Sequence, residues 1–309
     1  MFFNVSSIGR HIRVPSVLYL QEPHRQHYEA SPRLPWAALD IPDGWWRSPT
    51  YFVHRVKDLL RTHSLRAQVR EEFNNARAFE AILVNSYYSR ESVLRCYGLD
   101  SKVCYLGIDT ELFGNQAAPR ENLVVGIGLF APHKNIEFVI KALSYIRKRR
   151  PGLAWIGNGG DSDYLEELQR VAASCHVSFE PKLKVSDSEL VAALNRASIM
   201  VYAPRLEPFG FAPLEANACG LPVVAVAEGG VRETIVDGFN GVLVEHDPEA
   251  MAAAVQQLLD HPEYARQLGE NGSKLVAERW TATHSVDRLE RRLVETLRHA
   301  AVSSKTKAP

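Results

Sequence analysis

A strand–loop–helix–strand segment in the C-terminal half most restricts how this chain can fold. Residues 197–203 form a short apolar, β-branched run that predicts a parallel strand, and residues 204–210 interrupt it. Residues 211–219 predict a helix that ends at Gly220, and residues 221–226 predict the next strand. Such a unit belongs to a parallel sheet. Its loop then meets its helix at the carboxyl edge of the sheet, where open α/β folds bind ligands.

Two glutamates, Glu207 and Glu215, lie on either side of the expected start of this helix. The first amide groups of the helix, near Gly210 and Phe211, lack intrahelical partners and carry partial positive charge, so they can hold a phosphate. Glu207 precedes the helix and Glu215 lies about one turn past Phe211, so the two reach different parts of an elongated ligand. Carboxylates accept hydrogen bonds from paired hydroxyls, such as those of a sugar or a ribose. The alternative is a pair of ordinary surface glutamates.

Composition excludes several classes of protein. The 309 residues are enough for two domains, and a formal net charge of zero gives no indication of nucleic-acid binding. The four cysteines form no C-x-x-C pair, which argues against a zinc site or a disulfide framework and fits a reducing cytoplasm. No apolar run approaches the ~18 residues of a membrane span, and we expect no signal peptide.

Strand and helix signals alternate along the chain and predict a parallel sheet in each half. In the first half we expect strands at residues 15–20, 81–84 and 103–106, and helices at 51–80 and 87–96. In the second half we expect strands at 122–128, 153–156 and 177–179, and helices at 135–149, 164–174, 186–196, 248–259, 262–269, 271–279 and 280–300. A polar segment at residues 114–121 predicts the linker between the halves.

Two N-terminal segments are candidates for contact with an acceptor or a membrane. Residues 33–49 are rich in Pro and Trp, with Trp36, Trp45 and Trp46, and predict an irregular loop over an acceptor site or a membrane surface. The helix at residues 51–80 is basic. A solvated helix face is the favoured interpretation, and a membrane-surface helix drawn to anionic lipid is the alternative.

Two further patterns have ordinary explanations. Gly126, Gly128 and Ala131 form a G-x-G-x-x-A string, but no acidic residue follows at the ~20-residue distance of a dinucleotide site, so we reject an NAD-binding interpretation. Asp161 and Asp163 resemble a metal-binding D-x-D pair. We expect Asp161 to cap the next helix and Asp163 to lie in its first turn instead. We likewise expect Ser186 to cap the helix at residues 186–196, with Glu189 at the capping-box position.

The segment around the two glutamates resembles the E-x7-E segment of retaining glycosyltransferases of family 4, which have the GT-B fold. The residues that carry the resemblance are Glu207-Pro208-Phe209-Gly210, Glu215-Ala216, Ala218, Gly220, Pro222-Val223-Val224-Ala225, Gly229-Gly230 and Gly238 to Gly241. Residues 85–113 resemble the end of the family's N-terminal domain. Residues 128–135 resemble its G-R-L-x-P-x-K-G segment, with Lys134 at the Lys position but Leu129 at the Arg position.

The resemblance implies an α/β protein of the GT-B fold, with two Rossmann-like domains facing across a cleft. It is strong for residues 82–280, weak for 15–25 and absent before that, so the N-terminal domain is expected to be incomplete, from truncation or a misplaced start. The implied parts are residues 1–118, an incomplete N-terminal acceptor domain; 119–279, a nucleotide-sugar-binding domain; 280–300, a helix crossing back to the first domain; and 301–309, a flexible tail.

The implied activity is retaining transfer of a sugar from a nucleoside-diphosphate sugar to an acceptor hydroxyl. Glu207 would bind the donor sugar, Glu215 the ribose, and Lys134 the diphosphate. Gln21 falls near a histidine that the family often places beside the transferred sugar, and His24 is the alternative. The expected donor-binding residues are Glu215, Gly128, Pro208, Phe209, Gly210 and Phe211, with Lys182 and Val185 near the base.

The resemblance implies no cofactor and no metal. The expected partners are a UDP-, GDP- or ADP-sugar and a glycan or lipid acceptor, with no nucleic acid. A cytoplasmic location follows, with peripheral contact at the inner membrane as a further expectation. The alternative function is a catalytically impaired sugar-nucleotide-binding or interaction module. Leu129 and the missing N-terminal units motivate that alternative, because a lost cation at the diphosphate weakens transition-state stabilisation.

Overall fold

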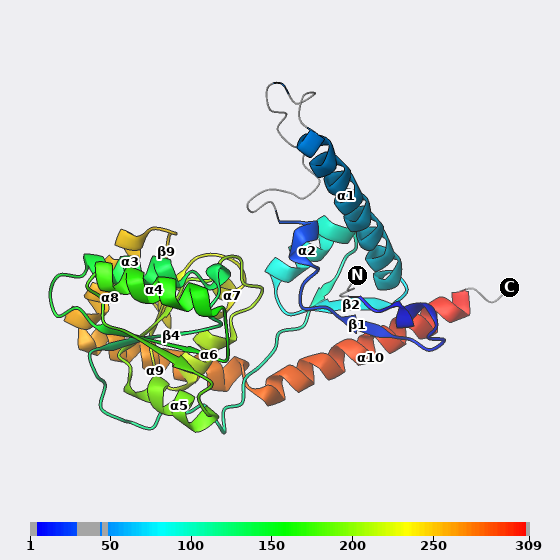
Figure 1. The fold of residues 1–309 in the computed structure, drawn as a ribbon. Coiled ribbons are helices and arrows are strands. Elements are labelled where there is room, and N and C mark those ends of the chain that lie inside the picture. Colours follow the sequence, from blue (N-terminus) through cyan, green and yellow to red (C-terminus); the bar gives the residue numbers. More distant parts are fainter. Residues whose placement is uncertain (1–4, 30–43, 45–48, 307–309) are drawn as a thin grey trace. The chain divides into compact units, whose positions relative to one another are not determined.

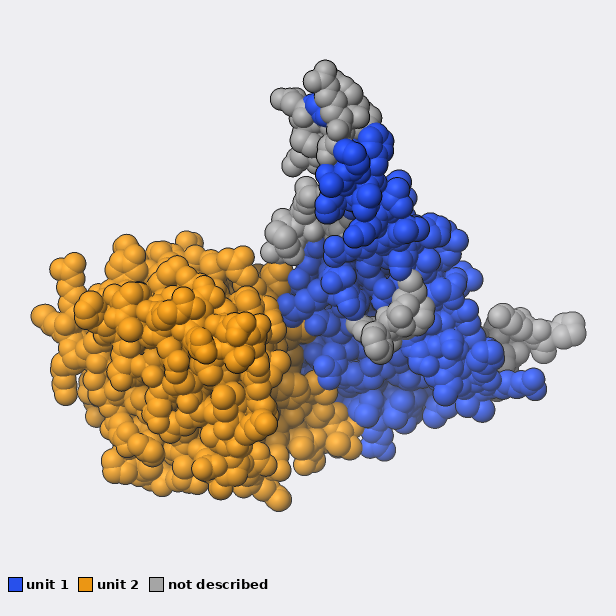
Figure 2. Space-filling model, viewed as in Figure 1, with its two compact units in different colours: residues 1–105, 288–309 blue, residues 106–287 orange. Residues whose placement is uncertain are grey.

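The chain divides into two compact units, each built around a parallel sheet (Figures 1 and 2). The computed structural model describes residues 5–29, 44 and 49–306. Unit 1 combines residues 1–105 with 288–309, and unit 2 comprises residues 106–287. Apart from Gly44 and Pro49, the expected aromatic loop at residues 33–49 lies outside the described residues.

The segment before the first strand of unit 2 belongs to that unit, so the boundary lies near residue 106 and not at 118. The Asn195 side chain accepts a hydrogen bond from the Gln116 amide at 2.7 Å and donates to the Gly114 carbonyl at 3.0 Å. The Arg120 guanidinium donates to the carbonyls of Leu194 and Cys219 at 2.7 and 2.8 Å. These bonds hold the polar segment against unit 2.

Unit 1 has a three-stranded parallel sheet in the order β1-β2-β3. Its strands are β1 (Val17–Tyr19), β2 (Ala81–Val84) and β3 (Lys102–Val103). Its helices are α1 (Pro49–Ala76), α2 (Tyr87–Tyr97) and, from residue 288 on, α10 (Ala282–Thr306), with short 3-10 turns η1 (Ser7–Arg10) and η2 (Arg25–His27). α10 continues past residue 300, where a flexible tail was expected. Within unit 1, Arg292 of α10 donates to the Val103 carbonyl at 3.0 Å.

Unit 2 has a six-stranded parallel sheet in the order β6-β5-β4-β7-β8-β9. Its strands are β4 (Leu123–Ile127), β5 (Gly152–Gly157), β6 (Phe179–Leu183), β7 (Ile199–Tyr202), β8 (Val223–Val226) and β9 (Gly241–Val244). Its helices are η4 (Pro132–Lys134), α3 (Ile136–Tyr145), α4 (Ser162–Ser174), α5 (Asp187–Arg196), α6 (Phe211–Ala218), α7 (Val231–Thr234), α8 (Pro248–Asp260) and α9 (Pro262–Arg279). β9 and α7 were not predicted.

Helices cover both faces of this sheet, as a parallel sheet requires (Figure 1). α3, α4 and α8 lie on one side, and their apolar residues form the largest buried cluster with the strands. α5, α6 and α9 lie on the other side. Within the sheet, Trp155 is 1% exposed, and a Cβ at Gly126 on the neighbouring strand would come within 2.3 Å of its ring. Glycine is therefore required there by close packing.

Some predicted boundaries in unit 2 were wrong. The strand expected at residues 177–179 runs from Phe179 to Leu183, and the helix expected at 135–149 ends at Tyr145. The two helices expected at 262–279 are the single helix α9. Its Gly269 lets α9 approach the turn after α6, because a Cβ there would lie 2.1 Å from the Gly220 carbonyl oxygen.

The caps predicted for two helices of unit 2 are confirmed. The Asp161 carboxylate accepts hydrogen bonds from the amides of Asp163 and Tyr164, which makes it the N-cap of α4. Ser186 and Glu189 form a reciprocal capping box at the start of α5. Both devices satisfy amide groups that a helix end otherwise leaves without a partner.

The strand order of unit 2 reverses at β4. This strand pairs with β5 on one side and with β7 on the other. The loops that follow β4 (residues 128–135) and β7 (residues 203–210) therefore leave the carboxyl edge of the sheet side by side. A crevice at such a switch point is where open α/β sheets bind ligands.

Candidate active site

The two loops at the switch point of unit 2 are joined to each other. The Arg205 amide, in the loop after β7, donates to the His133 carbonyl at 3.0 Å. Next to this bond, the Lys134 Nζ atom donates to Glu207 Oε2 at 2.8 Å. Both side chains are partly buried, at 15% and 24% exposure. An ion pair with little solvent around it is stronger than one on an open surface. The structure thus brings together two of the predicted catalytic residues.

A glycine makes room for the lysine of this pair. Gly128 follows β4 with a φ of +154°, and a Cβ there would lie 3.1 Å from the Cδ atom of Lys134. The lysine stem therefore passes over the glycine. Asn135, directly after the lysine, adopts the left-handed conformation with φ 60° and starts α3. Leu129, which stands where the family has an arginine, is 46% exposed.

The backbone that carries Glu207 is strained, and a neighbouring turn supports it. Leu206 has a φ of +51°, a conformation that costs a residue with a Cβ energy. A turn at Gly229 and Gly230 supports the strained loop, and the Gly230 amide donates to the Glu207 carbonyl at 2.8 Å. A Cβ at Gly229 would lie 2.3 Å from that carbonyl oxygen, and one at Gly230 would lie 2.1 Å from the Pro208 oxygen. Only glycine permits this approach.

The N-terminus of α6 presents open amide groups. Gly210 is the N-cap residue with φ 106°, no side chain caps the helix, and the first turn contains no acidic residue. Such an end attracts an anion. Unlike these amide groups, the Phe209 side chain is buried. It is 2% exposed, and its ring lies 5.1 Å from that of Phe211 and 5.8 Å from that of Trp280. Any ligand contact of Phe209 is therefore made by its backbone.

Glu215 lies one turn inside α6 and is partly buried. Burial, together with the charge of Asp187, raises the pKa of Glu215 to about 7. Because Asp187 starts α5, the loop between β6 and α5 lies near Glu215. This loop contains Val185 and follows Lys182, which pairs with Glu180 at 3.3 Å. Contact of Lys182 and Val185 with a base stays a prediction.

Gln21 and His24, the two remaining predicted catalytic residues, belong to unit 1. Gln21 is exposed just after β1. His24 is the N-cap of η2, and its Nδ1 atom accepts from the Gln26 amide at 3.3 Å. Since they lie in a different unit from Glu207, their action on a shared ligand stays a prediction.

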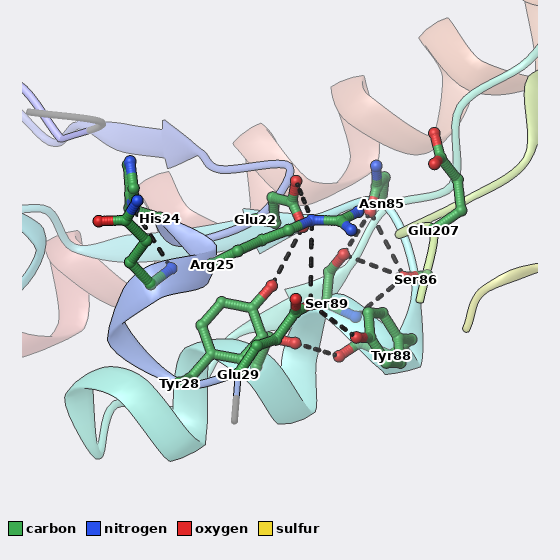
Figure 3. Close-up of polar contacts among 12 residues, drawn as sticks. Glu22, His24, Arg25, Tyr28, Glu29, Asn85, Ser86, Tyr88, Ser89 and Glu207 are labelled. Carbon is green, nitrogen blue, oxygen red and sulfur yellow. Dashed lines mark hydrogen bonds and ion pairs between the residues drawn. The ribbon is translucent and has the colours of Figure 1, made fainter. Parts of the chain in front are cut away.

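A polar network lies at the carboxyl ends of β1 and β2, and its contacts with Tyr28, Glu29 and Tyr88 were not predicted from the sequence (Figure 3). Arg25 lies 3.1 Å from Glu22 and 3.8 Å from Glu29, and Tyr28 and Tyr88 donate to these two carboxylates at 3.1 and 3.4 Å. Burial raises the pKa of Glu29, and the charge of Arg25 opposes this shift. Part of the signal was present, since Glu22 and Arg25 belong to the polar run that directly follows the strand predicted at residues 15–20.

Comparison with known proteins identifies the family of the chain. The family "Glycosyl transferases group 1" matches residues 108–275, more than half of the sequence. A GDP-mannose-dependent α-(1-6)-phosphatidylinositol monomannoside mannosyltransferase of Mycolicibacterium smegmatis is 31% identical over 220 residues, covering 63% of this chain and 57% of that protein. A D-inositol 3-phosphate glycosyltransferase of Stackebrandtia nassauensis is 29% identical, covering 90% of this chain and 69% of that protein. The chain spans about half the length of most curated relatives that it matches.

Solved structures show the fold of the family. Anabaena HepE, solved in complex with UDP, superposes with a TM-score of 0.67 at 20% identity, covering 74% of this chain and 68% of that one. Sucrose-phosphate synthase of Thermosynechococcus elongatus superposes with a TM-score of 0.65 at 26% identity, covering 76% of this chain and 62% of that one. The expected GT-B fold class is thereby confirmed. By its sequence match and its fold, the chain belongs to the group 1 glycosyl transferases.

Proposed function

We propose that this chain is a retaining glycosyltransferase that moves a sugar from a nucleoside-diphosphate sugar to an acceptor hydroxyl. The observation that carries the proposal is the Lys134–Glu207 pair at the switch point of unit 2, beside the open N-terminus of α6. A cation and a helix N-terminus together suit a diphosphate, and a neighbouring carboxylate suits sugar hydroxyls.

Each group has a separate part in binding the donor. Lys134 and the amides of Gly210 and Phe211 hold the diphosphate, and Glu207 accepts hydrogen bonds from the sugar hydroxyls. Glu215, one turn along α6, accepts from the ribose. The Glu207 carboxylate holds the Lys134 ammonium in place at 2.8 Å. The lysine is therefore already positioned to bind the diphosphate. Preorganised charges of this kind require little rearrangement during reaction.

In the proposed reaction, the bond between the anomeric carbon and the diphosphate oxygen breaks, and the acceptor oxygen bonds to that carbon on the same face. The leaving phosphate oxygen takes the proton of the acceptor hydroxyl. Lys134 and the start of α6 stabilise the negative charge that grows on the diphosphate. The step uses no protein nucleophile, and we propose that it needs no metal or cofactor.

The acceptor is proposed to be a glycan or a lipid carrying a free hydroxyl, with Gln21 or His24 of unit 1 beside the transferred sugar. Among the relatives, one is named for a phosphatidylinositol mannoside and another for D-inositol 3-phosphate. We propose a cytoplasmic location with peripheral contact at the inner membrane, where a lipid acceptor would be reached. No helix in the described part of the chain is long and apolar enough to cross a membrane.

Thermal unfolding with UDP, GDP, ADP and NAD tests the donor site. A nucleoside diphosphate at one hundred times its dissociation constant is expected to stabilise the chain by about 2.7 kcal/mol. NAD should give no shift, because it was excluded as a ligand. The base of the stabilising nucleotide identifies the donor. No shift with any diphosphate would contradict the proposal.

A second candidate function is a sugar-nucleotide-binding module without transfer activity. The observation that favours it is the exposed Leu129 in place of the family's arginine. The two functions separate in one experiment. A module shows stabilisation by a nucleoside diphosphate but no consumption of the matching sugar nucleotide with any acceptor hydroxyl, whereas the enzyme shows both.

Gly230→Ala is expected to lower both stability and donor binding. The new Cβ would lie 2.1 Å from the Pro208 oxygen, so the turn must move and the support of the Glu207 backbone is lost. We expect a loss of about 1–3 kcal/mol in unfolding free energy, the usual cost of overpacking. Chemical denaturation and nucleotide-induced stabilisation measure the two effects. Gly114→Ala is the matched control, since nothing lies within 4 Å of a Cβ at that position. Equal behaviour of the two variants would show that the turn does not support Glu207.

A further inference from the structure

The N-terminal half of α1 carries a row of exposed apolar side chains that the proposed reaction does not use. Val53, Val56, Leu59 and Leu60 form this apolar row, and they are 54–67% exposed. Their spacing places all four within about 120° of the helix circumference. Figure 1 shows this half of α1 standing clear of the sheet of unit 1. Single exposed apolar residues are common, but four on one helix face form a contiguous surface.

Basic residues border the apolar row. Between Pro49 and Arg70 the helix has five lysine or arginine residues and a single acidic residue, Asp58. The helical spacing places Asp58 on the side opposite the apolar row, while Lys57 and Arg66 lie at its two edges. The chain as a whole has a formal net charge of zero, so this positive charge is concentrated locally.

The apolar row is not a continuation of the face that α1 buries in unit 1. In its C-terminal half the helix buries a mostly polar set, including Gln68, Glu72 and Asn75. The buried Glu72 carboxylate accepts a hydrogen bond from Tyr97 at 2.6 Å. This buried face lies roughly 140° around the helix from the apolar row. Packing among the described residues of unit 1 therefore does not account for the four apolar residues, and a purely solvated helix would not need them.

We propose that the N-terminal half of α1 docks on the surface of an anionic lipid bilayer. The apolar row enters the boundary between headgroups and acyl chains, and the bordering basic residues bind the lipid phosphates. An exposed apolar face with cationic edges has the chemistry of an interfacial helix. A nucleic acid would engage the basic residues but not the apolar row. The proposal assigns the peripheral membrane contact included in the proposed function to one element, and it is independent of the donor site.

Co-sedimentation of the full chain with lipid vesicles tests the proposal, without donor or acceptor. Vesicles of phosphatidylcholine alone are compared with vesicles containing about one third phosphatidylglycerol. We expect binding to the anionic vesicles to be at least about tenfold tighter, since each basic residue near the surface contributes substantially. The binding should weaken at high salt, because screening shortens the reach of the charges. Equal binding to both vesicles, or none to either, would overturn the proposal.

Two double variants separate the apolar and the electrostatic contributions. Leu59→Ser with Leu60→Ser, and Lys57→Glu with Arg66→Glu, are each expected to weaken binding to anionic vesicles about tenfold or more. The matched controls are Leu297→Ser on α10, where the side chain is 55% exposed, and Arg147→Glu with Lys148→Glu at an exposed site of unit 2. Both controls should bind like the unchanged chain.

Two further readouts keep the result interpretable. Each variant should keep the nucleotide-induced thermal stabilisation of the unchanged chain, which shows that unit 2 is intact and separates a failure of the donor site from a failure of membrane docking. Sedimentation velocity without vesicles should show the same mass for the unchanged chain and the leucine variant. A larger mass that only the leucine variant abolishes would overturn the proposal, because a second copy would then cover the apolar row.

Discussion

Glu207→Gln is expected to lower sugar transfer by about 100- to 1000-fold while the chain stays folded. The carboxylate is held by Lys134 at 2.8 Å and by the turn beneath its backbone. An amide at this position cannot pair ionically with the lysine and accepts hydrogen bonds from sugar hydroxyls less strongly. Since the interaction is with the sugar, the affinity for the free nucleoside diphosphate should be retained. Turnover of the sugar nucleotide and binding of the diphosphate measure these two quantities.

The matched control for this variant is Glu166→Gln, which removes the same charge from an exposed position of α4. It should leave turnover unchanged. Turnover of Glu207→Gln within a fewfold of the unchanged chain would contradict the assigned role. Loss of diphosphate binding in the same variant would instead place Glu207 on the nucleotide and not on the sugar.

Glu215→Gln is expected to stabilise unit 2 at neutral and alkaline pH while it weakens donor binding. Burial and the charge of Asp187 raise the pKa of Glu215 to about 7, whereas an unfolded glutamate titrates near 4.3. The folded chain therefore binds more protons between these two values, so its unfolding free energy falls as the pH rises through this window. The cost is complete above pH 7 and amounts to at most about 4 kcal/mol.

The variant removes this cost. The difference in unfolding free energy between Glu215→Gln and the unchanged chain should be near zero at pH 4.5 and largest at pH 8. Chemical denaturation across this range measures it, with Glu166→Gln as the control for introducing an amide. In the unchanged chain, nucleotide affinity should rise as the carboxylate ionises near pH 7 and accepts hydrogen bonds from the ribose. The variant should lose this pH dependence. Equal stability differences at pH 5 and pH 8 would refute the account.

Local signals predicted the central segment of unit 2 well. The strand, loop, helix and strand at residues 197–226 appear as β7, α6 and β8, with ends within two residues of those expected. Apolar β-branched runs and a glycine at the helix end act over a few residues, so they can be detected in the sequence. The capping box of Ser186 and Glu189 was found for the same reason.

Elements that depend on distant contacts were predicted poorly. The close approach of α9 to Gly220, almost fifty positions earlier in the chain, rests on the absence of a side chain at Gly269. From the sequence alone, a glycine inside a helical pattern indicates a break. The network of Arg25 with its two glutamates and Tyr88 was also missed, since Tyr88 comes from a different element.

The sequence by itself determined the chemistry available to this protein: two carboxylates around a helix start, one lysine after a glycine-containing strand end, and a parallel α/β pattern. Only the tertiary structure decided that the lysine at position 134 meets the carboxylate at 207. That meeting requires β4 and β7 to pair across the reversal of strand order, and strand order depends on how whole helices cover the sheet. Likewise, the apolar residues of α1 could be counted in the sequence, but their exposure could not be predicted. Burial depends on which distant residues pack against a side chain, and the local pattern does not identify those residues.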